Sequence, residues 1–186
     1  MKLRAREAAA TVILEAAEEV AAVRGLEATS TALIADRAGV SVGTLYNYFV
    51  DRDALLAALF KLRRDELLPR VVAAADAAKG LPFEERLRTY MAGVSRVFED
   101  FRRFCGVAIS NEATSKIRGT NKSVVLATVT EALTDILRPI AKQRAEEYSR
   151  MMFGALKGVM QWCIEHEEPI APAANLMVDV FLKGLT

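Results

Sequence analysis

Apolar residues recur every three to four positions along most of the chain, which is the period of an amphipathic α-helix. The first such stretch runs from Ala5 to Val23 and ends in Arg24 and Gly25. A basic last turn followed by glycine is typical of a helix C-terminus. Strand-like alternation is not sustained over any long segment, so the pattern predicts an all-α protein of about nine helices.

Two short helices around a tight turn are predicted between residues 30 and 53. Ser30 is a suitable N-cap for the first, and Gly39 can adopt the left-handed conformation that ends it. Ser41 can cap the second helix, which the pattern extends to Phe49. Leu45 and Phe49 lie four residues apart, so both can reach one core.

The second helix leaves polar and aromatic residues outside: Val42, Gly43, Thr44, Tyr46, Asn47 and Tyr48. Hydroxyl and amide groups can bond base edges or phosphate oxygens, and this geometry is typical of a helix-turn-helix whose second helix enters the DNA major groove. A small helical hairpin whose tyrosines merely cover a core has the same spacing.

The neighbouring sequence favours the DNA-binding interpretation. The segments that favour it are Gly25–Thr29, Ile34-Ala35, Ala38–Ser41, Gly43–Tyr46, Tyr48-Phe49, and Arg52 with Leu55. Through these segments, about a quarter of the chain resembles the TetR family of transcriptional regulators. The resemblance implies a three-helix DNA-binding domain over 1–50. It also implies an effector-binding and dimerisation domain over 51–186, with a connecting helix from about residue 51.

The expected DNA contacts come from both short helices and the residue that follows them: Ser30, Thr31, Ser41, Val42, Gly43, Thr44, Tyr46, Asn47, Tyr48 and Arg52. Two of these depart from the family pattern. Val42 stands where the family often has a basic residue, and it favours apolar contact with a thymine methyl. Arg52 replaces the usual lysine and keeps a charge that can be directed at a phosphate.

Further helices are expected over 51–78, from Phe83, over about 121–142 and over 145–166, with Pro172 in the first turn of the last one. The segment from Cys105 to Lys122 is ambiguous, and its part from Thr114 to Thr120 is predicted to be a mobile polar turn.

The last two helices are too apolar for the surface of a monomer. We expect them to form a four-helix interface in a homodimer, as the resemblance also implies, through Gly154, Ala155, Gly158, Leu176, Val180 and Phe181. A larger intramolecular core is the alternative.

The resemblance further implies a small-molecule effector. Candidate pocket residues are Tyr90, Met91, Val94, Phe98, Phe101, Phe104, Cys105, Met152 and Trp162. Their apolar character favours a hydrophobic or aromatic effector, although such stripes also form ordinary cores. The working hypothesis is a dimeric repressor that the effector releases from its operator, with activator and co-repressor schemes left open.

Charge and cysteine content limit the other possibilities. The net charge is only +1, so DNA affinity must depend on where cations lie, including a possible flexible arm with Lys2, Arg4 and Arg6. Two distant cysteines fit a reducing compartment, and no apolar run reaches membrane-spanning length. We therefore expect a cytoplasmic protein without a membrane partner.

Catalysis has little support in the sequence. The sole histidine, His166, lies three residues after Cys163, and a metal or nucleophilic site would need more groups than this pair. No phosphate-binding glycine loop is present. We expect no catalytic residue, metal or cofactor, and the alternative to a regulator is a helical protein–protein adaptor that does not read DNA.

Overall fold

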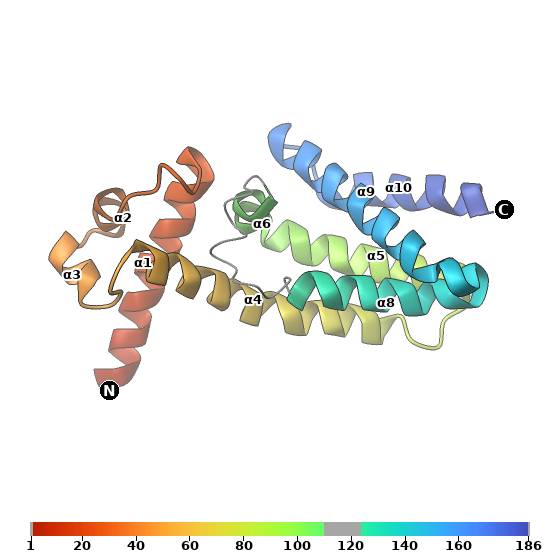
Figure 1. Cartoon of the computed structure of the whole chain (residues 1–186), viewed down its shortest axis with the longest axis horizontal. Helices are drawn as coiled ribbons and strands as arrows, with labels where there is room; N and C mark the ends of the chain where they lie inside the picture. The colour runs from red at the N-terminus through yellow and green to blue at the C-terminus, as the bar shows by residue number, and fades with distance from the viewer. Residues whose placement is uncertain (1, 110–123, 186) are drawn as a thin grey trace. The chain divides into compact units, whose positions relative to one another are not determined.

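The predicted helices are observed in the expected order, and one further helix lies over Arg102–Ile109, where the sequence is ambiguous from Cys105 onward. The structure is a computed structural model that describes residues 2–109 and 124–185, and the predicted turn from Thr114 to Thr120 lies outside the described residues. The described part contains nine α-helices and one 3-10 turn, labelled in Figure 1. The all-α fold is therefore confirmed.

The chain divides into two compact units. Of the described residues, the first unit comprises 2–63 and 103–109, and the second comprises 64–102 and 124–185. The long helix α4 (Arg52–Ala77) contributes residues to both units, so the expected domain boundary at residue 50 stays a prediction.

The first unit is built on three helices: α1 (Lys2–Arg24), α2 (Thr31–Ala38) and α3 (Val42–Tyr46). They share one core with the start of α4 and with α6 (Arg102–Ile109). The buried side chains are Ile13, Leu14, Ala16, Ala17, Ala21, Leu26, Ile34, Ala35, Leu45, Leu55, Leu56, Leu59 and Val107. Helix α1 begins at Lys2, so the backbone of Lys2, Arg4 and Arg6 is helical, and the expected contact of these residues with DNA stays a prediction.

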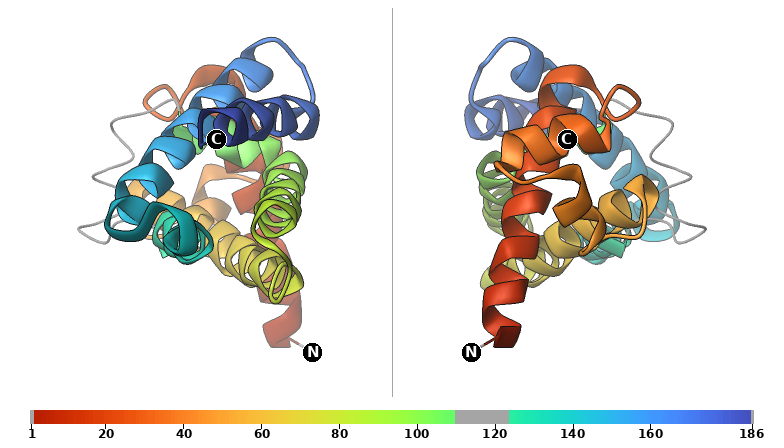
Figure 2. Two further views of the ribbon diagram at one scale, coloured as in Figure 1. Left: turned by 90° about the vertical axis from the view of Figure 1, so that its right-hand side faces the viewer. Right: turned by 90° about the vertical axis from the view of Figure 1, so that its left-hand side faces the viewer.

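The second unit contains the rest of α4 and a bundle of four further helices. These are α5 (Phe83–Asp100), α8 (Val124–Ala141), α9 (Ala145–Glu165) and α10 (Ile170–Leu185), with the turn η1 (Lys142–Arg144) between α8 and α9. Helix α10 packs on α5 and α9, and α8 packs on α9 and α5. Figure 2, left, shows α5 and α8 nearly end-on.

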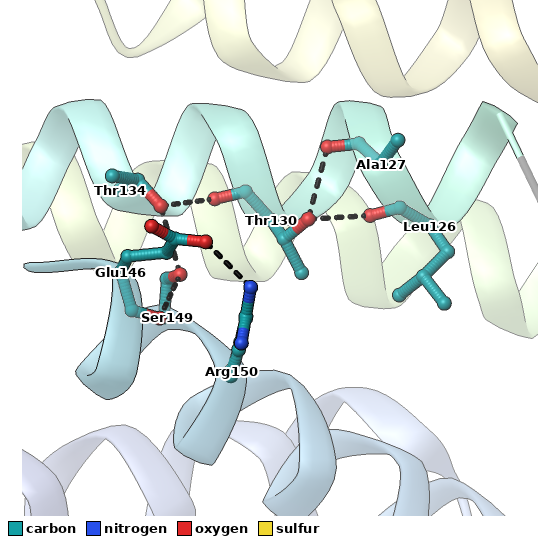
Figure 3. Close-up of polar contacts among 7 residues, drawn as sticks. All are labelled: Leu126, Ala127, Thr130, Thr134, Glu146, Ser149 and Arg150. Carbon is teal, nitrogen blue, oxygen red and sulfur yellow. Dashed lines mark hydrogen bonds and ion pairs between the residues drawn. The ribbon is translucent and has the colours of Figure 1, made fainter. Parts of the chain in front are cut away.

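Helices α8 and α9 are joined by hydroxyl groups as well as by apolar side chains (Figure 3). Thr134 Oγ1 lies 2.8 Å from Ser149 Oγ and 2.8 Å from the Thr130 carbonyl oxygen. Ser149 is completely buried, and its hydroxyl lies 2.9 Å from the carbonyl oxygen of Glu146. Since unpaired buried hydroxyls are costly, these bonds favour one register between the two helices.

A close helix contact in the second unit gives a test of its packing. A Cβ added at Gly93 of α5 would lie 2.8 Å from the Cβ of Ala74 in α4. We expect Gly93→Ala to lower the free energy of unfolding by about 1–2 kcal/mol, because overpacking outweighs the gain in helix propensity. Thermal unfolding measures this loss, and Ala74→Gly in the same chain should recover part of it. Simple additivity of the two changes would contradict the contact.

Candidate nucleic-acid interface

Local hydrogen bonds fix the turn between α2 and α3. Ser30 Oγ accepts the backbone N–H of Leu33 at 3.3 Å, and Ser41 Oγ accepts that of Thr44 at 3.0 Å. Gly39 has φ +67°, and its N–H donates to the Asp36 carbonyl at 3.1 Å. Both predicted N-caps and the left-handed glycine are confirmed, so short-range sequence signals determine where each helix begins and where α2 ends.

Helix α3 is shorter than predicted. Its regular part ends at Tyr46 with Asn47 as C-cap, although the Phe49 N–H still donates to the Leu45 carbonyl at 3.1 Å. Leu45 is completely buried and anchors the helix in the core of the first unit. Tyr48 and Phe49 are partly buried against the same core, so they belong to the segment that supports α3.

The outer face of α3 is open to solvent. Ser41, Gly43 and Asn47 are exposed, and Val42 and Tyr46 are 39% and 48% exposed. Thr44 is partly exposed, with its hydroxyl 2.8 Å from Ser41 Oγ. These side chains can therefore meet a partner without any rearrangement of the core.

The N-terminus of α2 lies next to this face. The hydroxyl oxygens of Thr31 and Tyr46 are 3.4 Å apart, which places residues of both predicted helices together. Arg6 of α1 reaches the other end of α3, where its guanidinium lies 5.9 Å from the Tyr48 ring centroid and donates to the Asn47 carbonyl at 3.4 Å. The contact of Arg6 with this site has no local sequence signal, because it joins residues about forty positions apart.

Arg52 is engaged inside the first unit. Its Nε donates to the Thr29 carbonyl at 2.5 Å, and its Nη2 donates to the Leu26 carbonyl. The guanidinium thus holds the loop between α1 and α2 against the start of α4, a planar two-point contact that arginine makes and lysine does not. The expected contact of Arg52 with a DNA phosphate stays a prediction.

Comparison with known proteins agrees with this geometry. Residues 13–59 match the model of "Bacterial regulatory proteins, tetR family". A TetR-like transcriptional regulator from Rhodococcus sp. RHA1 is 26% identical with a TM-score of 0.80, over 97% of this chain and 95% of that one. The chain is a member of the TetR family of transcriptional regulators.

Two other relatives are regulators from Bacillus subtilis. The fatty acid metabolism regulator protein of Bacillus subtilis (strain 168) is 37% identical over 59 residues, which is 32% of this chain and only 30% of that protein. The structure of FadR from Bacillus subtilis in complex with stearoyl-CoA has a TM-score of 0.72 at 19% identity, over 91% of this chain and 96% of that one. The second likeness shows the shared fold.

The predicted pocket residues of this TetR-family regulator differ in burial and lie in two different units. Tyr90, Met91, Val94 and Phe98 of α5 are buried in the second unit, as is Met152 of α9. Phe101 is partly exposed beneath the Arg70 guanidinium, 5.4 Å from its ring centroid. Phe104 and Cys105 belong to the first unit, where Phe104 packs edge-on against Phe60 with ring centroids 5.1 Å apart.

Trp162 also lies apart from the buried set. It is 51% exposed, and its ring stacks on that of His166 with centroids 4.6 Å apart. The exposed position follows from the face of α9 on which it lies, since Cys163 one residue later is completely buried. Sequence periodicity alone could not tell which side of this apolar helix faces inward.

The predicted dimer residues are largely exposed in the single chain. Gly154, Ala155 and Gly158 are exposed on α9, and Leu176 and Val180 are 66% and 65% exposed on α10, while Phe181 is partly exposed. An added Cβ at Gly154 or Gly158 would meet nothing within 4 Å. An unfilled apolar surface of this kind is typical of an interface between subunits.

The remaining candidate groups have local partners. His166 Nδ1 lies 2.9 Å from the Trp162 carbonyl, and Cys163 Sγ lies 3.6 Å from the Pro169 carbonyl, where burial raises the pKa of the thiol. Within the described ranges, no three His, Cys, Asp or Glu side chains are grouped as a metal site would require. Among the helices of 2–109 and 124–185, none combines the length and apolarity needed to cross a bilayer.

The role of Arg52 can be tested with two variants. We expect Arg52→Lys and Arg52→Gln to lower the free energy of unfolding by about 1 kcal/mol or more, because both lose the paired carbonyl contact. If both carbonyl contacts of Arg52 persist on DNA, the dependence of DNA affinity on salt should stay unchanged in Arg52→Gln; if Arg52 instead contacts a phosphate as the sequence predicts, that dependence should weaken. Arg64→Gln, at a partly exposed position of α4, is the control. A fall in the log–log salt slope of about 0.9 for each subunit, or about 1.8 for the dimer, would reveal a phosphate contact.

Proposed function

We propose that this regulator is a homodimeric repressor that reads a DNA operator with α3 and leaves it when a hydrophobic or aromatic effector binds. The observation that carries the proposal is the exposed polar and aromatic face of α3, held on a buried Leu45 and two serine caps. Because it acts on a DNA operator, we propose that it works in the cytoplasm, and we assign it no catalytic role. The relatives of this chain are regulators by name, so the adaptor alternative has no support.

The reading face combines three kinds of DNA contact. Thr44 and Tyr46 carry hydroxyls for base edges or phosphates, and Val42 offers an apolar side chain for a thymine methyl. Ser30 and Thr31 at the start of α2 are suited to the phosphate backbone. Because the chain has a net charge of only +1, a single reading face should bind DNA weakly. Two copies of this face, which we call the two heads of a dimer, are needed for tight binding.

Dimerisation supplies the second head. On α9 an exposed stripe runs through Met151, Ala155, Gly158 and Trp162, positions separated by four, three and four residues. Such residues lie on one helix face. The small residues in the stripe let a partner helix approach closely, and the exposed apolar side chains of α10 extend the same kind of surface. A four-helix contact between two copies would cover both helices.

The effector is proposed to bind in the second unit. The buried side chains of α5 and α9 are mostly apolar, and among them the Tyr90 hydroxyl donates to the Val129 carbonyl at 3.3 Å. Successive major grooves are about 34 Å apart, and the two heads must match this spacing to bind. An effector that binds more tightly to a dimer with a different separation of the heads would therefore shift the dimer away from DNA. Coupling of this kind typically amounts to about 1–3 kcal/mol. Stearoyl-CoA, with which FadR of Bacillus subtilis forms a complex, is a suitable first probe.

The DNA-reading role predicts a specific loss of affinity. Duplexes are first selected from random-sequence DNA with the native protein, and the affinity of Tyr46→Ala for the selected duplex is then measured. We expect a loss of about tenfold or more, as for other base or phosphate contacts removed from a reading helix. Val72→Ala, at an exposed position of α4 in the second unit, is the control and should leave the affinity unchanged. Unchanged binding by Tyr46→Ala at moderate salt would contradict the proposed face.

Two substitutions on different faces of α9 test the proposed dimer interface. Gly158→Leu places a large side chain on the stripe and should shift the protein from dimer to monomer in light scattering at micromolar concentration. Lys157→Leu adds a similar side chain on a different helix face and should leave the dimer intact. Both positions are exposed in the single chain, so neither change disturbs its core. A native protein that is monomeric would overturn the proposal.

A further inference from the structure

We propose that the adjacent residues Arg102 and Arg103 are positioning residues that couple the turn between α9 and α10 to the DNA-reading helices. Arg102 binds that turn within the second unit, and Arg103 binds α1 within the first unit. A single peptide bond joins the two. The inference rests on the proposed function, because it explains how a change in α9 and α10 would reach α2.

The first half of the link is a cluster at the α9–α10 turn. Arg102 Nη1 donates to the Glu168 carbonyl at 2.6 Å, and Nη2 donates to the Cys163 carbonyl in the last turn of α9. Glu99 lies 3.1 Å from Arg102 Nη1, and its other oxygen accepts the Ile170 N–H at 2.6 Å. A guanidinium thus satisfies the end of α9 while a carboxylate satisfies the start of α10. This cluster fixes the two proposed dimer helices at their junction.

The second half of the link is a carboxylate shared by two arginines. Glu19 of α1 has one oxygen 3.2 Å from Arg103 Nη1, and its other oxygen pairs with Arg37 Nη2 of α2. Glu19 therefore connects α6 to the first helix of the helix-turn-helix. Since α2 ends at the turn that leads into α3, a displacement of Arg103 can be passed to the reading helix through two ion pairs.

Helix α6 packs in the same core as α1, so a displacement of α6 should also move α1. Next to Glu19, the buried Glu18 pairs with Arg63 of α4 at 2.5 Å, with side-chain exposures of 8% and 16%. Cys105 of α6 is buried near Glu18, and burial together with that charge raises the pKa of the thiol to about 12. Val107 is buried in the same core as Ile13 and Leu59. Because packed cores move as units and deform little, α6 and α1 are expected to shift together.

The exposure of the outer ion pairs suits a coupling role. Arg103, Arg37 and Glu19 are 55%, 59% and 31% exposed, and pairs of that kind contribute little to folding. Their removal should therefore change communication between the two ends of the link without unfolding the protein. A purely structural role would predict the opposite, a loss of stability with unchanged communication.

A double-mutant cycle tests the link without requiring the effector. Arg102→Gln and Glu19→Gln are made singly and together, and the affinity of each dimer for the selected duplex is measured at fixed salt. Side chains that do not interact change affinity additively, whereas coupled ones do not. We expect the double variant to deviate at least threefold from the product of the single effects. Arg102→Gln combined with Arg6→Gln is the control pair and should be additive.

Amide hydrogen exchange provides a second readout that does not depend on DNA. We expect Arg102→Gln to change exchange in α2 at least threefold, and Glu19→Gln or Arg103→Gln to abolish that response. Arg103→Lys, which keeps the charge facing Glu19, should restore it. Melting temperatures establish that each variant is folded.

The outcomes separate this inference from the proposed function. Additive affinities, together with unchanged α2 exchange in Arg102→Gln, would overturn the link. If no duplex is selected from random DNA, the proposed function fails, and the exchange data alone then decide whether Arg102 and Arg103 connect the two ends.

Discussion

The burial of Leu45 is the interaction on which the DNA-reading part of this protein depends. Helix α3 has only five residues, far fewer than an isolated helix needs to be stable in water. Its position must therefore come from tertiary contact, and Leu45 provides it within the core that includes Ile34 and Leu55. The serine caps define where the helices start, but the buried leucine determines which face of α3 looks outward.

This arrangement separates support from reading. Leu45 anchors the segment together with the partly buried Tyr48 and Phe49. Val42, Thr44 and Tyr46 take no part in this anchoring, so their side chains are available to contact the operator. Support also comes from residues distant in sequence. Arg52 holds the α1–α2 loop, and α6 adds Val107 to the same core. The first unit is thus completed by a segment that follows α5 in the chain.

Features determined by neighbouring residues were predictable from the sequence. The caps at Ser30 and Ser41, the left-handed Gly39 and the burial of Leu45 follow from short-range rules of helix initiation, termination and periodicity. The family assignment also depended on this compact segment. These signals are reliable because the atoms that form each contact lie within a few residues of one another.

Features set by distant contacts were not predictable in the same way. The partners of Arg52 are backbone carbonyls, which carry no side-chain signature in the sequence. Phe104 and Cys105 were grouped with the residues of α5 because they are apolar and adjacent to it, yet they pack in the other unit. On the strongly apolar α9, periodicity could not show that Trp162 faces solvent in the single chain.

Methylation interference on the selected duplex is the most direct measurement of the central claim, that the outer face of α3 enters the major groove. Guanine N7 lies in the major groove and adenine N3 lies in the minor groove, so methylation at each blocks a different approach. The account predicts that N7 methylation within the protected half-sites prevents binding by the native dimer. Interference confined to adenine N3, with N7 methylation tolerated throughout, would contradict it.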